Sequence, residues 1–267
     1  MVVPFLMVTC GLWKLKKINN MKEPLRILFK FPCRYRKDMF FKSLDSLNDN
    51  IRDRNNYHIG LTLDTDDNIL NTPEVIEKLS TYPNVSIQWG LSGSKISAIN
   101  RSMPDYDFDL IICWSQDMFA EFYGFDDIIR AECYNINNQH GDDFLYHLPE
   151  PDSREMLNVL YIATRKYFDR FGYIYHSSYQ SLFCDNETMC VAKMLGRYFY
   201  SGTMGLYSHR NPAYHQYNLE KDDLFLEQQG LWGVDEANFH ARRKINFDLK
   251  EEEIVDKYYL SQTFPYT

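Results

Sequence analysis

Residues 109–117 read DLIICWSQD, an apolar run of strand length that ends in polar side chains. Three runs of the same kind precede it, LRILFKF at 25–31, YHIGLTLD at 57–64 and VSIQWG at 85–90. Segments with apolar residues at helical spacing separate these runs, and 36–51 is the clearest of them. Because strands alternate with helices, the sequence predicts an α/β fold with a mixed, mostly parallel central sheet and helices on both faces.

The other elements are expected from local signals. Helices are predicted over 73–82, which opens with a proline, and over 94–103. After residue 120 the pattern loosens, and we expect acidic loops over 124–155, helices over 155–172 and 186–196, and a strand over 197–209.

The chain shows no internal repeat and no Ser/Pro linker, so one main domain is expected. We predict this domain over 25–215, an N-terminal extension over 1–24, and a partly helical C-terminal tail, packed on the domain, over 216–267. The opening MVVPFLMVTCGLW has 13 residues and its lysines follow it, so neither stable membrane insertion nor a secretory signal is expected. A weak contact with a membrane surface is an alternative for this segment, and Met21 is a second candidate for the start of the chain.

The formal net charge of −8 disfavours a grip on a nucleic-acid backbone. Residues 1–42 nevertheless hold ten Lys or Arg and two acids, a net +8, so the remainder carries −16. That basic part could face a diphosphate or lie on a solvated face. The six cysteines form no CxxC pair, which argues against a zinc site and predicts a reducing compartment: the cytoplasm, or the host cytoplasm for a viral protein.

Polar residues follow each of the four apolar runs. Parallel sheets bind ligands at the carboxyl ends of their strands, so these residues should share one site. They are Pro32-Cys33-Arg34, Asp64-Thr65-Asp66-Asp67, Gly93-Ser94-Lys95 and Ser115-Gln116-Asp117.

This order of strand-end residues, over 25–212, resembles the family 2 glycosyltransferases. The segments that carry the resemblance are FPCRYR (31–36), Asp64, GLSGSKISAINRSM (90–103), SQD (115–117) and CDNETMCVAKMLG (184–196). The resemblance implies the GT-A nucleotide-diphospho-sugar fold. It also implies transfer of a sugar from a nucleotide-diphosphate donor to an acceptor hydroxyl.

The resemblance places the donor base at the first two strand ends. The turn that holds Pro32 and Arg34 would line the base, and Asp64 would accept a hydrogen bond from a uracil or guanine N–H. Asp66 belongs to the same acidic run and is a further donor-site candidate. A turn acid that caps the next element is the alternative for Asp64.

The next two strand ends are expected to meet the diphosphate. Lys95 could contact a phosphate as a point charge. Asn100 stands where the family has the Asn of its Ala-x-Asn segment, and Gln116 stands inside the segment that matches the Asp-x-Asp motif.

That motif implies a metal site for Mn²⁺ or Mg²⁺. The chain departs from the family because its first acid is Ser115, so Asp117 is the one carboxylate left as a ligand. Hard divalent cations prefer oxygen ligands, and the donor phosphates and waters can supply the others. His209 matches a family histidine that reaches the metal or diphosphate, with Arg210 and His215 as nearby alternatives.

The resemblance assigns the catalytic base to Asp185, eleven residues before Gly196. Such a base removes the acceptor proton in an inverting reaction, and the helix dipole helps to keep it ionised. Cys184 departs from the family, which often has a Glu there, and Glu187 is a second catalytic candidate. A plain N-cap is the alternative for Asp185.

The leading hypothesis is therefore an inverting, metal-dependent transferase that uses a UDP-sugar and acts on a glycan or another hydroxyl. Three alternatives are a phage or viral enzyme that glycosylates hydroxymethylated DNA bases, a sugar-phosphate nucleotidyltransferase, and a GT-A domain that binds without turnover. Trp232 is a candidate for stacking on a sugar or base, whereas Trp89 and Trp114 are expected in the core. The sequence does not indicate an oligomeric state.

Overall fold

The computed structural model describes residues 23–257, except for residues 92, 152, 155, 214–216 and 218. Most of the predicted 1–24 extension, its apolar opening segment and the candidate His215 therefore lie outside the described residues. In the part of the chain that is described, no helix has the length and apolar character needed to cross a membrane.

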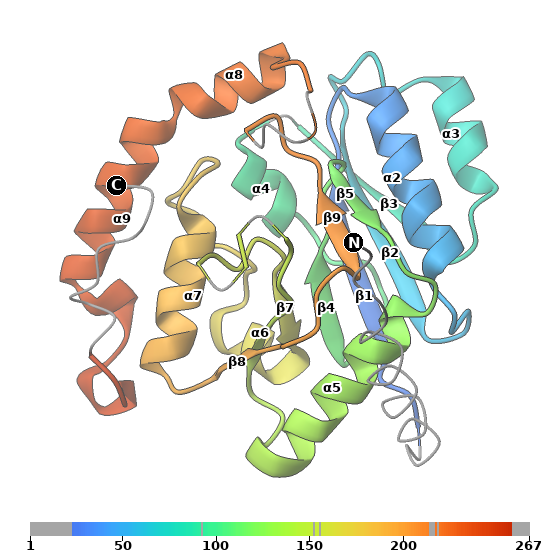
Figure 1. The fold of residues 1–267 in the computed structure, drawn as a ribbon. Coiled ribbons are helices and arrows are strands. Elements are labelled where there is room, and N and C mark those ends of the chain that lie inside the picture. The colour runs from blue at the N-terminus through green and yellow to red at the C-terminus, as the bar shows by residue number, and fades with distance from the viewer. Residues whose placement is uncertain are drawn as a thin grey trace, which may run out of the picture.

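Seven strands form the main sheet, in the order β3-β2-β1-β4-β7-β6-β8 (Figure 1). β1 pairs in parallel with β2 and β4, β2 with β3, and β6 with β8, whereas β7 is antiparallel to β4 and β6. This confirms the predicted mixed, mostly parallel sheet. The strands are β1 (Ile27–Pro32), β2 (Tyr57–Asp64), β3 (Val85–Gly90), β4 (Leu110–Cys113), β6 (Leu145–His147), β7 (Ile162–Thr164) and β8 (Tyr198–Tyr200).

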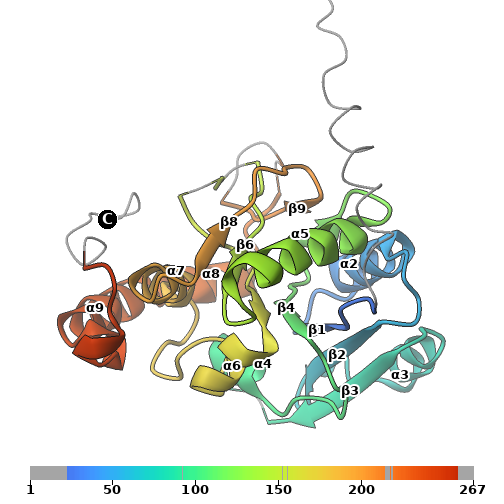
Figure 2. The same cartoon turned by 90° about the horizontal axis from the view of Figure 1, so that it is seen from below.

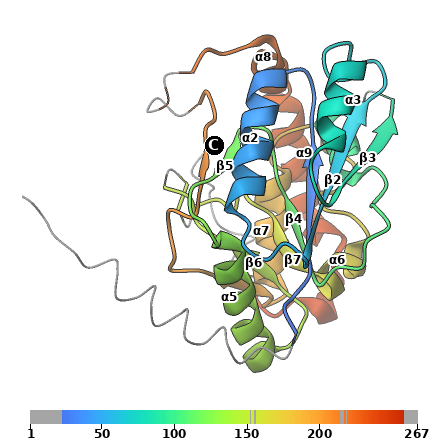
Figure 3. The same ribbon diagram turned by 90° about the vertical axis from the view of Figure 1, so that its right-hand side faces the viewer.

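Helices cover both faces of this sheet, as predicted. One face carries α2 (Lys37–Asn50), α3 (Pro73–Ser80) and α5 (Phe125–His140), and Figure 3 shows α2 and α3 side by side there. The other face carries α4 (Lys95–Asn100), α6 (Arg165–Phe171) and α7 (Cys184–Met194). Further along the chain are α8 (Asp223–Gly230), α9 (Trp232–Lys244) and the 3₁₀ turns η2 (Asn246–Asp248) and η3 (Glu251–Glu253). In Figure 2, α9 lies outside α7, and the two helices are in contact.

The central strand β1 shows how alternation builds two cores. Phe29 and Phe31 pack under α2 and α5, while Leu28 packs with α4 and α7 on the other face. Lys30 also points to the second face and is fully buried. Its ammonium donates to the carbonyls of Arg101 and Ser102, at 2.8 and 3.0 Å, and burial lowers its pKa to about 8. Lys30 therefore ties the chain after α4 to the centre of the sheet.

Loops were predicted over 124–155, but the structure has helix α5 over much of this range. Phe125, Ile129 and Cys133 recur every four residues, and all three are buried against the sheet. Gly124 and Gly141 bound the helix with φ angles of 80° and 87°. The prediction was wrong because the acidic and amide residues of the exposed face masked a regular apolar stripe.

The single helix predicted over 155–172 is also wrong. The apolar part of this segment forms strand β7, and α6 begins only after Thr164, whose hydroxyl accepts from the Tyr167 N–H at 3.3 Å. The predicted end at Gly172 is confirmed, with a φ of 72°.

The strand predicted over 197–209 is split between two sheets. Its first part is β8, and its last part is β9 (Tyr207–His209), which pairs with β5 (Met118–Ala120) in a small antiparallel sheet. This pairing brings a segment from the end of the domain next to the loop that follows β4. The helices expected in part of the C-terminal region are present as α8 and α9.

Candidate functional site

Two adjoining cavities lie at the carboxyl ends of β1, β2 and β4, where parallel sheets bind ligands. The strand-end cavity, of about 270 Å³, is lined by Arg34, Asp64 and Asp117, among others. The α7 cavity, of similar volume, is lined by Asp185 and by residues of α8 and α9. Five residues line both cavities and so define their junction: Pro32, Lys95, Ser115, Ser181 and Gln228.

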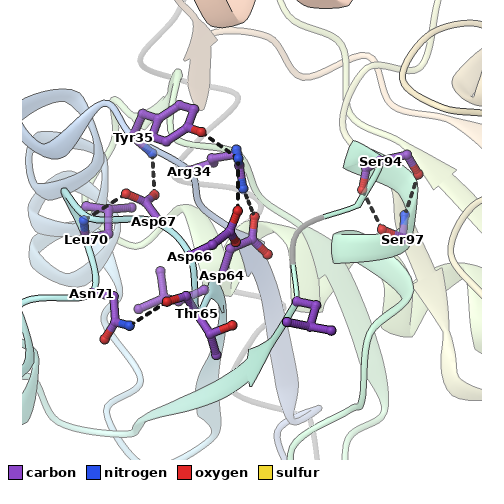
Figure 4. A network of polar contacts seen from close by, with 12 residues as sticks. Arg34, Tyr35, Asp64, Thr65, Asp66, Asp67, Leu70, Asn71, Ser94 and Ser97 are labelled. Carbon is purple, nitrogen blue, oxygen red and sulfur yellow. Dashed lines mark hydrogen bonds and ion pairs between the residues drawn. The ribbon is translucent and has the colours of Figure 1, made fainter.

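Asp64 is held at the end of β2 by two arginines. One carboxylate oxygen accepts from Arg34 at 2.5 Å and the other from Arg101 at 2.7 Å. Figure 4 shows the Arg34 guanidinium directed at Asp64, with Asp66 beside it and 3.6 Å from the same side chain. The guanidinium also lies over the ring of Tyr35, 4.4 Å from its centroid. The Asp64 side chain therefore binds arginines and does not cap the next element; α3 is capped by Thr72, whose hydroxyl accepts from the Val75 N–H at 3.4 Å.

Gln116 joins the first strand end to the fourth. Its amide nitrogen donates to the Arg34 carbonyl and its amide oxygen accepts from the Arg34 N–H, both at 3.0 Å. The Gln116 amide thus both donates to and accepts from the Arg34 backbone, as a peptide group does between paired strands. Gln116 therefore fixes the turn that carries Arg34 relative to the neighbouring Asp117.

Asp117, which lines the strand-end cavity, and His209, which lines the α7 cavity, face each other across the junction. The β5–β9 pairing places His209 opposite Met118, so its Nε2 lies 3.4 Å from an Asp117 carboxylate oxygen. The Ser115 hydroxyl donates to the other oxygen of Asp117. Burial alone would raise the pKa of Asp117, but the charge and hydrogen bond of His209, with help from Ser115 and Lys95, hold it well below its usual range.

The same contact acts on the histidine. Burial would lower the pKa of His209, but the Asp117 carboxylate outweighs this and raises it. A carboxylate and an imidazole that meet in this way fit a divalent cation whose other ligands come from phosphate oxygens or water. Among the described residues, no cluster of three or more His, Cys, Asp or Glu could hold a metal by itself.

Asp185 lies in the first turn of α7 and lines the α7 cavity. The residue before the helix, Phe183, has a φ of 60°, an uncommon conformation for an aromatic residue and one that clusters at functional sites. Burial raises the pKa of Asp185, and the Lys95 charge partly opposes the rise. The N-cap alternative is wrong, because the helix begins at Cys184 and Phe183 holds the cap position.

The structure does not bring Glu187 or Asn100 to the cavities. Glu187 is buried and accepts from Arg242 of α9 at 2.7 and 2.8 Å and from the Tyr179 hydroxyl at 2.7 Å. Asn100 donates to the Tyr175 carbonyl at 2.6 Å and accepts from the Ile174 N–H at 3.0 Å. Neither side chain lines either cavity, so their contacts support structural roles.

The burial of the tryptophans differs in part from the prediction. Trp114 is fully buried, as expected, whereas Trp89 is 38% exposed on the edge strand β3. Trp232, at the start of α9, lines the α7 cavity.

Three contributions to the site were not predicted from the sequence: Arg101, helix α8, and the ion pair between Arg36 and Asp222. Arg101 was quoted only as part of a segment, yet it holds Asp64, and a Cβ on Gly90 would come within 2.5 Å of its side chain. That glycine, at the end of a predicted strand, was the available signal. Helix α8 lines both cavities, and the Asp222 carboxylate at its N-cap pairs with Arg36 at 2.5 Å. Nothing local in the sequence links residues so far apart.

Comparisons with known proteins bear on the fold. The sequence matches no family model and no curated protein. The mannosyltransferase PcManGT from Pyrobaculum calidifontis, solved with GDP-Man and Mn²⁺, is similar with a TM-score of 0.54 and 13% identity over 73% of this chain and 64% of that chain. S. aureus TarS 1–349, solved with UDP-GlcNAc, has a TM-score of 0.55 and 14% identity over 85% of this chain and 69% of that chain.

This chain thus spans about two thirds of the length of those structures. At such low identity the likeness shows the fold alone. The chain has the GT-A fold of nucleotide-sugar transferases, as the resemblance implied.

Proposed function

We propose that this chain transfers a sugar from a nucleotide-diphosphate sugar to an acceptor hydroxyl. The observation that carries the proposal is the arrangement of the two cavities around the Asp117–His209 pair. Asp64 and Arg34 lie in the strand-end cavity, and Asp185 lies in the α7 cavity. A donor bound across the junction, with its nucleotide in the strand-end cavity, would place its anomeric carbon between its own diphosphate and Asp185.

The nucleobase is assigned to the strand-end cavity. Asp64 offers acceptor lone pairs and Arg34 offers donors beside it. Uracil, thymine and guanine carry an N–H next to a carbonyl and can pair with such an array. We propose UDP as the nucleotide, since uracil is among these bases and the TarS structure, which shares this fold, carries UDP-GlcNAc.

The diphosphate is assigned to the junction. Asp117 and His209 would hold Mn²⁺ or Mg²⁺ there, and the ion would neutralise charge on the departing nucleoside diphosphate. Lys95 lines both cavities and adds a fixed positive charge next to them. Ser115 stands in place of the first acid of the motif. Asp117 is therefore the carboxylate that would bind the metal, and Lys95 would add positive charge near the diphosphate.

Asp185 is proposed as the general base. The acceptor oxygen would attack the anomeric carbon, the bond from that carbon to the diphosphate oxygen would break, and the acceptor proton would pass to the Asp185 carboxylate. Asp185 lines the α7 cavity and Asp117 lines the strand-end cavity, so the acceptor would attack from the Asp185 side and the diphosphate would depart toward Asp117. This arrangement supports a single displacement with inversion.

A thermal-shift panel of UDP, GDP, CDP and TDP, each with and without Mn²⁺, tests the donor assignment. A nucleotide at a hundred times its Kd should stabilise the protein by about 2.7 kcal/mol. We expect UDP, with Mn²⁺, to give the largest rise in Tm. Equal responses with and without Mn²⁺ would contradict the metal assignment, and no response to any nucleotide would contradict the donor site.

A GT-A domain that binds without turnover is the second candidate, and Ser115 favours it because the family's first metal-binding acid is missing. UDP release from the UDP-sugar, measured with and without an acceptor, separates the two. Nucleotide binding without any release over hours would support the binding-only domain.

A further inference from the structure

The α7 cavity has an aromatic wall beside Asp185. The rings of Phe183 and Trp232 meet edge to face, with centroids 5.0 Å apart and planes at 76°. Phe225 of α8 lines the same cavity. Trp232 is only partly buried, so a molecule in the cavity can contact its ring.

This wall is fixed relative to Asp185. Asp235, three residues after Trp232 on α9, is fully buried and accepts from three successive N–H groups of the loop before α7. The three bonds, from Gln180, Ser181 and Leu182, are 2.9, 2.8 and 2.7 Å long. They tie the first turn of α9 to the loop that leads into Phe183, so Trp232 and Asp185 keep one relative position.

Four amide side chains lie in the polar lining of this cavity, beside Asp185, His209 and Lys95. Amide groups donate and accept hydrogen bonds without a fixed charge, which suits hydroxyls. The four are Asn186, Asn211, Gln228 and Gln229. Of the described residues that line the cavity, Lys95 is the sole Lys or Arg, and it lies at the junction with the strand-end cavity.

We propose that the acceptor is an uncharged sugar ring, bound with one face against Trp232 and with its reactive hydroxyl at Asp185. This inference rests on the proposed function and names the acceptor class for the same site. A pyranose has an apolar face of C–H groups, which packs on an aromatic ring, and a rim of hydroxyls, which pair with amides. The C-terminal region thus supplies much of the acceptor site.

The cavity fits other acceptors less well. Its volume of about 270 Å³ suits one ring better than a long acyl chain. A hydroxymethylated base in DNA would bring phosphates, which call for several cationic side chains, and the described lining offers Lys95 alone.

The test uses saturation-transfer difference NMR on the full chain. The probes are methyl β-D-glucopyranoside, methyl β-D-galactopyranoside and methyl N-acetyl-β-D-glucosaminide, each with and without UDP and Mg²⁺. We expect at least one glycoside to bind, with the strongest transfer on the protons of one ring face. Trp232→Ala should weaken its binding by roughly tenfold or more.

Two variants serve as controls. Trp232→Phe keeps an aromatic ring against Phe183 and should retain most of the glycoside affinity. Trp89→Ala removes a tryptophan that is 38% exposed and lines neither cavity, and should bind the glycosides as the wild type does. The UDP-induced rise in Tm should be the same in all three variants, which shows that each still folds.

Unchanged glycoside binding in Trp232→Ala overturns the proposal. So does silence of all three glycosides, or tighter binding of cyclohexanol or of an oligonucleotide that contains 5-hydroxymethylcytosine. The donor assignment fails separately: if UDP gives no response while a glycoside still binds through Trp232, the acceptor inference stands and the donor site does not.

Discussion

The two halves of the cleft are built by different means. The strand-end cavity is formed largely by turns that follow parallel strands, and the charged side chains of Arg34, Asp64 and Asp117 line it. The α7 cavity is lined by the start of α7 and by the two C-terminal helices, among other segments, and aromatic and amide groups lie there beside Asp185. The fold itself places the first set, since strand ends must meet, whereas the second set depends on how the last helices pack. We therefore expect changes in the first half to act on the nucleotide and changes in the second half to act on the acceptor.

The largest effect should come from Asp185, which belongs to the α7 half. Asp185→Asn removes the proposed base and should lower kcat by about 10²–10⁴-fold, while UDP affinity stays within about twofold. Asp223→Asn is the matched control, because Asp223 is an exposed acid in the first turn of α8 and lines neither cavity. Steady-state kinetics and calorimetry with UDP check both statements, and retained turnover in Asp185→Asn would sink the assignment.

The pH dependence follows from the same residue. Its pKa is raised by burial, with Lys95 and His209 opposing the rise, so the activity should fall with decreasing pH through an acid limb above the usual carboxyl range of about 4. The folded state then binds the Asp185 proton more tightly than the unfolded state does. This group therefore lowers stability at neutral pH, and Asp185→Asn should unfold at a higher Tm than the wild type at pH 7.

The second largest effect should be on stability and should fall on the acceptor half. Arg242→Met leaves Glu187 buried without its guanidinium, and the free energy of unfolding should drop by about 3–5 kcal/mol. Lys244→Met, on the exposed last turn of the same helix, should stay within about 0.5 kcal/mol of the wild type. Denaturant unfolding measures both. A small loss in Arg242→Met would mean that α9 is not held by this pair.

A third effect should fall on the nucleotide alone. Arg101→Met removes one of the two arginines that hold Asp64, and UDP affinity should fall by about 10–100-fold, as expected for a lost hydrogen bond to a charged group. Gly90→Ala should act in the same direction, because its Cβ would lie 2.5 Å from the Arg101 side chain.

Gly202→Ala is the control for the glycine variant, since no atom lies within 4 Å of a Cβ built there. Calorimetry with UDP, and NMR with the glycosides, should show a loss for UDP and none for the glycosides. Equal losses for both ligands would break the division of the cleft into two halves.

These halves also differ in how far the sequence predicts them. The four strand runs and their polar ends were readable because a buried parallel strand leaves a continuous apolar run, and its ligand residues follow at once. Asp64, Lys95 and Asp117 were found in this way, and all three line the strand-end cavity. The site residues that were found before the structure are therefore mainly those that the chain itself places next to a strand.

The rest depends on contacts between residues far apart in the chain. Nothing in the local sequence of Glu187 shows that Arg242 will neutralise it, so a buried ion pair resembled a second catalytic acid. The split of 197–209 into β8 and β9 has a similar cause, because each half finds a different partner strand. The apolar stripe of α5 was present in the sequence, and the surrounding acids and amides concealed it.

The smallest effect should come from the ion pair that links the two halves. Arg36 follows the turn after β1, and its partner Asp222 caps α8, whose residues line both cavities. The Asp222 side chain is 43% exposed, so the pair should contribute only about 0.2–1 kcal/mol.

Arg36→Gln should therefore weaken UDP binding less than about fivefold, mainly through a faster dissociation rate. Added salt should weaken UDP binding more in the wild type than in the variant, because only the wild type has this contact to screen. Lys37→Gln is the control: it removes a neighbouring charge that faces Glu74 on α3, at 3.7 Å, instead of α8. A loss in Lys37→Gln as large as that in Arg36→Gln would mean that general charge near β1 governs nucleotide release, and that α8 has no part in it.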